Sequence, residues 1–525
     1  MEHTGKKLKA EVDFTTRPLL KKTILFALPL VLSSVLQLLY SAADIIVLGR
    51  FAGDESEAAV AAVGSTGALV NLITNLFIGL SVGALAVAAR FVGARDKDRL
   101  SKSVHTSISV SVISGFIVGI FGFFMSEMML EWMDTPSSVL GLSALYLKIY
   151  FVGVPFNFLY NFASSVLRAC GDTRRPLIAL AAAGVVNIGL NIIMVAGLKM
   201  SVAGVGIATV ASEAVAAIGV TAALMRRKDA AKLVLKKLRI HKSVFADIVK
   251  IGLPAGLQGI IFSLSNVIIQ SSINGFGKVA MAGNAAAGNL EGFVYVAMNS
   301  VAQACLTVSG QNYGAAKPKN IDLSLVQCLL LVTGTGAVLG VGVWLFSPFL
   351  LKLYGCGGEA LAFGKERLAV ICTMYFLCGI MEVLVSALRA IGRSVMPMLV
   401  SIVGVCGVRI LWIYTVFRTW HTLFILQVSY PVSWFITLAV HLVCYLAARK
   451  KTFAELRAMK PLFADEAEKA CVCEDAELTV AENATETGGE VAAQNADNRV
   501  EIAVDKLLDS VECEQAGSDS PSRKE

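Results

Sequence analysis

Charged residues are scarce in this 525-residue chain: Asp, Glu, Lys and Arg make up 16% of it, against 56% hydrophobic residues. A soluble globular protein carries roughly a quarter charged residues, so this composition excludes a polar surface around the whole molecule. Much of the outside must face lipid, where free backbone N–H and C=O groups find no water to bond. The long apolar runs therefore predict an all-α integral membrane protein.

Signatures of catalysis and metal binding are also missing. The five histidines do not cluster, and the chain has no Walker loop, nucleophile elbow or HExxH motif. The eleven cysteines lack the spacing of zinc ligands and lie mostly in apolar segments, as small buried hydrophobes do. These absences argue against an ATP-driven pump and most membrane hydrolases. We expect no enzyme activity, no metal and no cofactor.

Positive charge is concentrated in the connections between apolar segments. The net charge is +7, but residues from Leu462 onward hold 17 acidic and 5 basic residues. The excess of Lys and Arg therefore lies in the rest of the chain. This distribution is typical of a protein whose partner is the lipid bilayer, and we expect no nucleic-acid partner.

Twelve segments are long enough to cross a bilayer, for which about 20 residues are needed. They cover about 23–49, 58–89, 103–126, 141–166, 177–197, 203–225, 245–273, 279–309, 322–346, 367–388, 397–417 and 423–447.

Basic residues mark every second connection, which the positive-inside rule assigns to the cytoplasm. We therefore predict a multi-pass cell-membrane protein with both termini in the cytoplasm. Lys352 to Arg367 is the one connection whose charges leave its side undecided. The basic connections carry Arg90, Arg95, Lys97, Arg99 and Lys102; Arg168, Arg174 and Arg175; Arg226 through Lys242; Lys317 and Lys319; and Arg389 and Arg393.

The two halves of the chain repeat each other. Leu167-Arg168-Ala169-Cys170-Gly171 recurs 221 residues later as Leu388-Arg389-Ala390-Ile391-Gly392, and Gly93-Ala94 recurs at the same offset as Gly314-Ala315. Six spans per copy give both copies the same orientation. The repeat thus predicts two six-helix lobes related by a pseudo-two-fold axis along the membrane normal. The predicted organisation is a cytoplasmic N-terminus (1–22), an N-lobe (23–225), a basic linker (226–244), a C-lobe (245–450) and an acidic, mostly disordered cytoplasmic tail (451–525).

Polar residues inside the spans are the candidates for function, because ionisable groups there are costly. Asp44, Tyr40 and Gln37 share one face of the first helix, which we expect to line a cavity. The carboxylate could bind a proton or a sodium ion; alternatively, Asp44 lies at the outer end of its helix, solvated near Arg50.

Amides and a hydroxyl in the fifth and sixth spans form a second group. Asn187 and Asn191 are four residues apart and point the same way, and Thr209 follows in the next span. Such groups either serve a site or simply hold helices together. Glu213, near the middle of the sixth span, is a further candidate.

Glu382 in the tenth span and Arg409 in the eleventh form a candidate charged pair in the second lobe. A mutual salt bridge is expected, since an unpaired buried charge is expensive. Pro29 and Pro254 fall inside spans, where proline removes a hydrogen bond and permits a kink. They are hinge candidates, although static kinks are as common.

Short motifs in both halves carry a family resemblance. With them, the sequence resembles the multidrug and toxic compound extrusion (MATE) transporters, in the branch common among bacteria, over about residues 18–450. The motifs are Leu28-Pro29-Leu30, Gln37, Tyr40-Ser41-Ala42-Ala43-Asp44, Gly49-Arg50, Gly93-Ala94-Arg95, Pro155-Phe156, Leu167 through Thr173 with Pro176, Gly252-Leu253-Pro254, Gly379-Ile380-Met381-Glu382 and Leu388-Arg389.

The resemblance implies two lobes around a V-shaped cavity and alternating access driven by inward H⁺ or Na⁺. Asp44 matches the first-helix aspartate used for cation coupling, and Asn187 and Thr209 match polar members of the same site. Asn191 stands where many members carry an aspartate, which favours protons. Glu382 resembles a residue typical of this branch.

We therefore expect an exporter of amphipathic, cationic small molecules by antiport with H⁺ or Na⁺, acting as a monomer. Tyr295, Met298, Met281 and Phe293 are candidate cavity residues. One alternative is a lipid-linked-sugar flippase of the same superfamily, whose cavities are often richer in arginine. A less favoured one is an integral-membrane enzyme of the acyltransferase type, which would need a histidine or a carboxylate cluster at one membrane face. Substrate and ion stay open at this stage.

Overall fold

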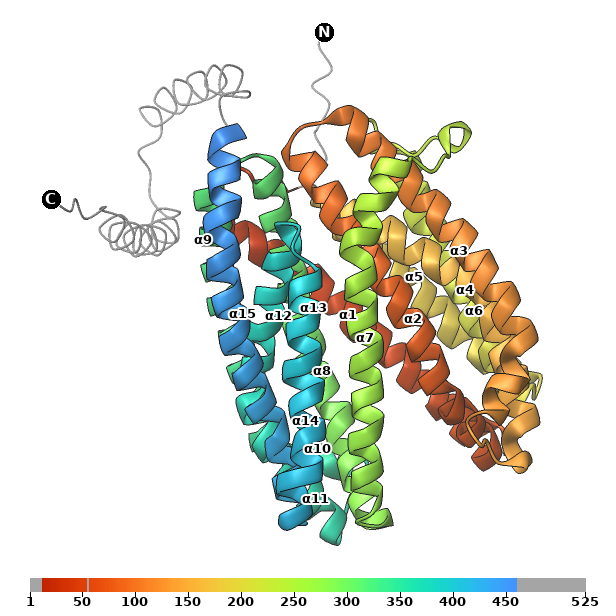
Figure 1. Ribbon diagram of the computed structural model, residues 1–525. Coiled ribbons are helices and arrows are strands. Elements are labelled where there is room, and N and C mark those ends of the chain that lie inside the picture. Colours follow the sequence, from red (N-terminus) through yellow and green to blue (C-terminus); the bar gives the residue numbers. More distant parts are fainter. Residues whose placement is uncertain (1–11, 54–55, 460–525) are drawn as a thin grey trace, which may run out of the picture.

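The computed structural model describes residues 12–53 and 56–459, and in these it contains helices and connections but no strand (Figure 1). Twelve helices in this part of the chain are long and apolar enough to cross a membrane, as predicted. The six of the N-lobe are α1 (Leu19–Phe51), α2 (Ser56–Gly93), α3 (Lys97–Glu131), α4 (Ser137–Ala169), α5 (Arg174–Asn191), which continues as the π-helical turn η2 (Ile192–Gly197), and α6 (Ser201–Met225).

Six more spans form the C-lobe, after a linker that holds the short turn η3 (Leu235–Lys237). Several are built from more than one helical piece. They are α7 (Lys242–Asn274); α8 (Lys278–Gly314); α9 (Pro318–Leu345), followed by the short α10 (Ser347–Leu353); α11 (Gly358–Ile371), η4 (Cys372–Met374) and α12 (Tyr375–Ala390) as one span; α13 (Val395–Ser401), η5 (Ile402–Gly407), α14 (Val408–Trp412) and η6 (Ile413–Phe417) as another; and α15 (Leu423–Met459).

Two predicted boundaries differ from those of the structure. The tenth span begins at Gly358 rather than 367, which places Arg367 inside a helix and not on a connection. Helix α15 continues to Met459, beyond the predicted lobe boundary at residue 450. The rest of the predicted acidic tail lies outside the described residues.

Helices α2 and α7 join the two lobes through glycine. A Cβ atom on Gly79 would collide with the backbone of Gly256, and one on Gly83 with the backbone of Gly252. Small residues let helix backbones approach closely in a membrane, where packing rather than water drives association. Pro254 lies between the two α7 glycines, so this hinge candidate sits at a close approach of the lobes.

Reciprocal contacts between α2 and α8 confirm the predicted pseudo-two-fold relationship. A Cβ on Gly93 would meet the carbonyl of Gln311, and a Cβ on Gly314 would meet the carbonyl of Arg90. Gly314 follows Gly93 by 221 positions, and Gln311 follows Arg90 by the same number. The π-helical turns show the same offset, since η2 starts at Ile192 and η6 at Ile413.

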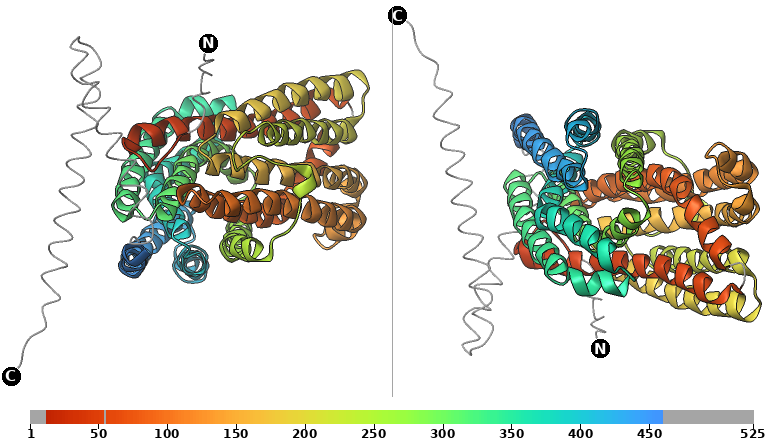
Figure 2. Two further views of the ribbon diagram at one scale, coloured as in Figure 1. Left: turned by 90° about the horizontal axis from the view of Figure 1, so that it is seen from above. Right: turned by 90° about the horizontal axis from the view of Figure 1, so that it is seen from below.

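The lobes meet at one end of the molecule, which we call the basic end. It is formed by the connections 94–96, 170–173, 226–241, 315–317 and 391–394. In Figure 1 the ribbons converge toward this end and diverge toward the other. Seen along the helices, the red-to-yellow N-lobe and the blue-green C-lobe lie on opposite sides, with α7 alongside α2 (Figure 2).

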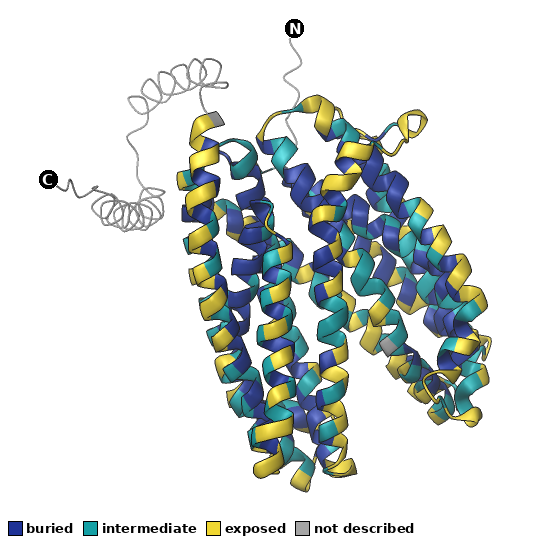
Figure 3. Ribbon diagram, viewed as in Figure 1, coloured by how far each residue is buried: buried dark blue, intermediate teal, exposed yellow. Residues whose placement is uncertain are grey.

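Many large apolar side chains are exposed on the outside of the molecule, as expected for a surface that faces lipid. Phe124, Val185 and Val338 are 77%, 75% and 73% exposed, and Figure 3 shows exposed positions running along the outer helices of both lobes. In water such a surface would drive aggregation. In a bilayer it is the contact surface with acyl chains.

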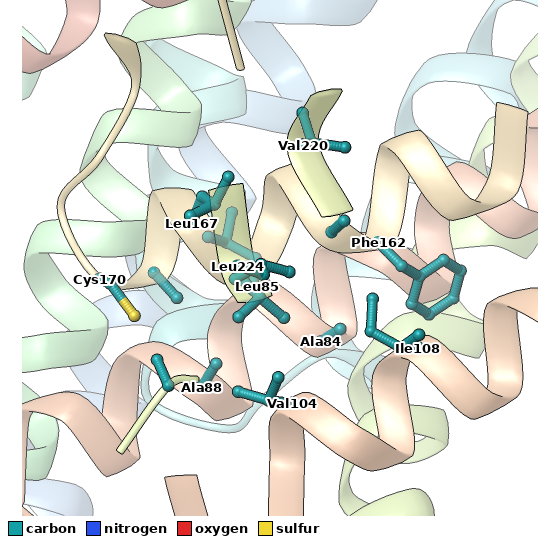
Figure 4. Close-up of a cluster of buried hydrophobic side chains, with 14 of the residues drawn as sticks. Ala84, Leu85, Ala88, Val104, Ile108, Phe162, Leu167, Cys170, Val220 and Leu224 are labelled. Carbon is teal, nitrogen blue, oxygen red and sulfur yellow. The ribbon is translucent and has the colours of Figure 1, made fainter. Parts of the chain in front are cut away.

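Near the basic end, the interior of the N-lobe is packed mainly from α2, α3, α4 and α6, and α5 and α7 also contribute (Figure 4). Small residues of α2 allow larger ones of the neighbouring helices to fill the space between them. Close van der Waals packing is the main attraction between helices in lipid. The residues drawn there include Ala84, Leu85 and Ala88 of α2, Val104 and Ile108 of α3, Phe162 and Leu167 of α4, and Val220 and Leu224 of α6.

Candidate functional site

Of the polar N-lobe residues singled out in the sequence, the structure brings together Asp44, Asn187, Asn191 and Thr209. The Asn191 side-chain Nδ2 donates to Oδ1 of Asp44 at 2.6 Å, and the Thr209 hydroxyl lies 3.4 Å from Oδ2. Asn191 Nδ2 also contacts Oδ1 of Asn187 at 3.2 Å. These residues come from α1, α5 and α6, and we call them the Asp44 cluster.

Local helix geometry explains the arrangement. Asn187 and Asn191 lie one turn apart on α5 and are 3% and 0% exposed. The helix widens into η2 directly after Asn191, and such π-helical turns are frequent at functional sites. Thr209 is held by its own helix, because its hydroxyl also donates to the carbonyl of Val205 at 2.9 Å.

The Asp44 cluster is rich in oxygen acceptors. Besides the carboxylate, Oδ1 of Asn191 is buried and has no hydrogen-bond partner in the described part of the chain. Carboxylate, amide and hydroxyl oxygens are the ligands that hard cations prefer, and a protonated carboxyl could donate to an amide oxygen. The cluster can therefore hold either a proton or a small cation.

A second carboxylate lies one turn further along α6. Asn157 of α4 donates to Oε1 of Glu213 at 2.8 Å, while Oε2 is buried without a partner among the described residues. Gly153 makes room for it, since a Cβ there would lie 3.1 Å from Oε2. Glu213 had only weak support in the sequence. Asn157 and Asn161, four apart in the fourth span, were the signal that was missed.

The other two polar residues of the first helix behave differently. Tyr40 donates its hydroxyl to the carbonyl of Leu180 at 2.8 Å and packs against Gly184, so it ties α1 to α5. Gln37 is exposed. Tyr40 is therefore a contact between α1 and α5, on the same face of α1 as Asp44.

Both hinge candidates lie within unbroken helices. Pro29 is part of α1, and its carbonyl accepts the Ser33 hydroxyl at 2.8 Å. Pro254 is buried in α7. Whether either residue acts as a hinge stays a prediction.

The predicted salt bridge between Glu382 and Arg409 is wrong: no ion pair joins them in the described residues. Arg409 donates Nε to the Ser433 hydroxyl at 3.0 Å, and its guanidinium lies 4.1 Å from the ring centre of Tyr430. Both partners, Ser433 and Tyr430, belong to α15. Arg409 lies on α14, which is flanked by the π-helical turns η5 and η6.

Buried ion pairs exist elsewhere in the C-lobe. Arg367 contacts both carboxylate oxygens of Glu291 at 2.7 Å, and Arg449 contacts Asp322 at 2.7 Å. Asn284 and Tyr445 add hydrogen bonds to these pairs. The sequence had placed Arg367 at the edge of a span and passed over its acidic partner.

Glu382 and Arg409 nevertheless line the same cavity, which has a volume of about 320 Å³. Its aromatic wall includes Tyr375 stacked on Trp434, with ring centres 5.2 Å apart. Tyr295, a cavity candidate from the sequence, lines it too. Another candidate, Met298, is 1% exposed and belongs to the packed core. Residue Asn75 of α2 reaches the cavity from the N-lobe side and donates to Ser263 at 3.0 Å.

Comparisons with known proteins agree with this architecture. The chain is 28% identical over 392 residues to the probable multidrug resistance protein YpnP of Bacillus subtilis, covering 75% of this chain and 87% of that protein. It is 24% identical to the multidrug export protein MepA of Staphylococcus saprophyticus, covering 70% and 81%. An outward-facing MATE family transporter of the MOP superfamily has the same fold, with a TM-score of 0.77 at 21% identity, over 86% of this chain and all of that one.

The repeat found in the sequence is also visible in the family match. The MatE family model matches residues 29–193 and 254–415, one segment in each half. Together the two segments cover most of both lobes. The chain therefore belongs to the MatE family.

Proposed function

We propose that this protein is a secondary active exporter that exchanges amphipathic, cationic small molecules for protons. The observation that carries the proposal is Asp44, which is held between α5 and α6 by Asn191 and Thr209. Membership of the MatE family and relatives named as multidrug export proteins support the transport class.

Helix α1 connects the cluster to both lobes. Its first turns, with Phe26 and Leu30, pack against Ala304 and Val308 of α8. Its later turns, with Tyr40 and Asp44, contact α5. A change at Asp44 therefore acts on a helix whose other half packs against the C-lobe. Pro29 lies within that other half, next to Leu30.

Protonation would change what Asp44 can bond. As a carboxylate it accepts from Asn191 and Thr209; as a neutral acid it becomes a donor on one oxygen. The partnerless Oδ1 of Asn191 offers an acceptor if the amide rotates. The hydrogen bonds between α1 and α5 would then rearrange, which couples the arrival of a proton to the position of α1.

The proton is the favoured ion because the cluster holds a single carboxylate. Asn191 contributes oxygen without charge, so Na⁺ would meet one negative charge among neutral ligands. For hard cations such as Ca²⁺, affinity rises with the charge of the ligands, so the single carboxylate favours a proton over Na⁺. A proton needs only one carboxyl group.

The test is transport in proteoliposomes under separate pH and Na⁺ gradients, with ethidium as the probe. We expect a pH gradient alone to drive ethidium accumulation and Asp44→Asn to abolish it. Glu131→Gln, which removes an exposed carboxylate at the end of α3, is the matched control and should transport normally. Full gradient-driven transport by the Asp44→Asn protein would refute the assigned role.

A further inference from the structure

Arg409 is a buried guanidinium that forms no ion pair among the described residues. It is 5% exposed and lines the C-lobe cavity, and its one hydrogen bond there is from Nε to Ser433. Tyr430 and Trp434 lie beside the guanidinium at 4.1 and 5.8 Å. Cation–π contacts offset part of the cost of burial. They leave both terminal nitrogens of the guanidinium with hydrogens to donate.

The neighbouring charges do not supply the missing anion. Glu382 lines the same cavity but forms no ion pair with Arg409 in the described part of the chain. The other two buried arginines of this lobe, Arg367 and Arg449, each have a carboxylate partner at 2.7 Å. A buried charge is normally paired. Arg409 thus lines the cavity without an ion-pair partner, although Glu382 lines it too, and its guanidinium is available to an anionic group of a ligand.

The rest of the cavity suits a flat ligand that also carries an amine. Tyr375, Trp434 and Tyr430 provide aromatic faces beside the guanidinium. Glu382 provides a carboxylate in the same space of about 320 Å³. Opposite charges that share a cavity without pairing with each other are both available to a bound molecule.

We propose that this cavity binds a zwitterionic aromatic molecule, with its carboxylate on Arg409 and its ring against Tyr375 and Trp434. The two terminal nitrogens of Arg409 match the two oxygens of a carboxylate, which gives strong and directional recognition. The amine of the ligand lies toward Glu382. This proposal names a class of substrate for the proposed function. It rests on that function only where it assumes that the bound molecule is exported.

The experiment is direct binding to the purified full-length protein in detergent, by isothermal titration calorimetry. Three probes share one ring system: 3-(1-naphthyl)alanine carries both charges, 3-(1-naphthyl)propionate only the carboxylate, and 2-(1-naphthyl)ethylamine only the amine. We expect naphthylalanine to bind most tightly. Arg409→Gln should weaken binding of the two carboxylates at least about tenfold, as expected for lost hydrogen bonds between charged groups, and leave the amine unchanged.

Arg418→Gln, which removes an exposed arginine from the same lobe, is the matched control and should not alter binding. Arg409→Lys keeps the charge but loses the paired donors, so its affinity for the carboxylates should fall between those of the wild type and Arg409→Gln. The site is overturned if the wild type binds the amine as tightly as naphthylalanine, or if Arg409→Gln weakens all three probes equally. Should Arg409→Gln fail to fold, the three-probe comparison on the wild type decides alone. The binding measurement involves no ion gradient. A protein that fails to couple transport to protons could therefore still bind the probes, and a protein that fails to bind them could still transport ethidium.

Discussion

Arg90 and Gln311 hold the two lobes together at the basic end through equivalent contacts. Arg90 donates Nε to the carbonyl of Ala390 at 2.9 Å, and Gln311 donates Nε2 to the carbonyl of Ala169 at 2.8 Å. Ala169 and Ala390 are the last residues of α4 and α12. Each side chain thus satisfies a carbonyl left open at the end of a helix in the opposite lobe. The two contacts close this end of the molecule.

Removing Arg90 should loosen the closed end more than removing Gln311. A hydrogen bond from a charged donor contributes about 1.5–3 kcal/mol and a neutral one about 1 kcal/mol. We expect Arg90→Ala to lower the thermal unfolding midpoint of the detergent-solubilised protein more than Gln311→Ala. Lys97→Ala, an exposed position nearby, is the control and should leave the midpoint unchanged. Equal midpoints for Arg90→Ala and Lys97→Ala would show that the contact does not hold the lobes.

A methyl group on Gly93 should prevent the same closure. Its Cβ would overlap the backbone of Gln311, which cannot move as a side chain can. Overpacking of this kind costs about 1–3 kcal/mol. Gly141→Ala is the matched control, because a Cβ there meets nothing within 4 Å and Ala is favoured over Gly in a helix by about 0.5–1 kcal/mol. Thermal unfolding should therefore shift downward for Gly93→Ala and slightly upward for Gly141→Ala.

Asn191→Asp should add a sodium response. The new carboxylate would lie where Nδ2 of Asn191 now contacts Asp44 at 2.6 Å. Two carboxylates this close repel unless a cation lies between them, and the added charge raises the affinity for Na⁺. We expect radioactive Na⁺ binding to the purified protein to increase over the wild type. Asn274→Asp, at the exposed end of α7, serves as the control; the prediction fails if both variants bind Na⁺ equally.

The buried pair of Glu291 and Arg367 should be important for stability. Glu291→Gln leaves Arg367 without its carboxylate, and breaking a buried pair on one side costs about 3–5 kcal/mol. The double variant Glu291→Leu with Arg367→Met removes both charges and should unfold at a midpoint closer to the wild type. Midpoints of the two variants measured in one detergent test this. A double variant less stable than the single one would contradict it.

Much of the fold could be predicted because lipid restricts the choices. Apolar runs gave the twelve spans, and the 221-residue repeat gave the two lobes. Within the N-lobe, spacing along single helices was enough to group Asn187 with Asn191, and the family resemblance added Asp44 and Thr209. These residues lie close together in the structure, although their role in coupling stays a proposal.

Partners in the C-lobe could not be predicted because they depend on helix rotation. Pairing Arg409 with Glu382 assumed regular helices, whereas π-helical turns on both sides of α14 direct the arginine toward α15. The true pairs join residues 76 and 127 positions apart. Nothing in the local pattern of one sequence indicates which of several buried charges will meet across such separations.

The double attachment of α1 has a consequence for how the chain could be divided. A cut in the linker between Met225 and Lys242 would sever the chain where it passes from one lobe to the other. Helix α1 of the N-terminal fragment would still pack against the C-terminal fragment, because Phe26 and Leu30 lie among residues of α8 and α9. Two separately expressed polypeptides should therefore assemble into one particle, with the N-terminal fragment contributing part of the C-terminal fragment's packed interior.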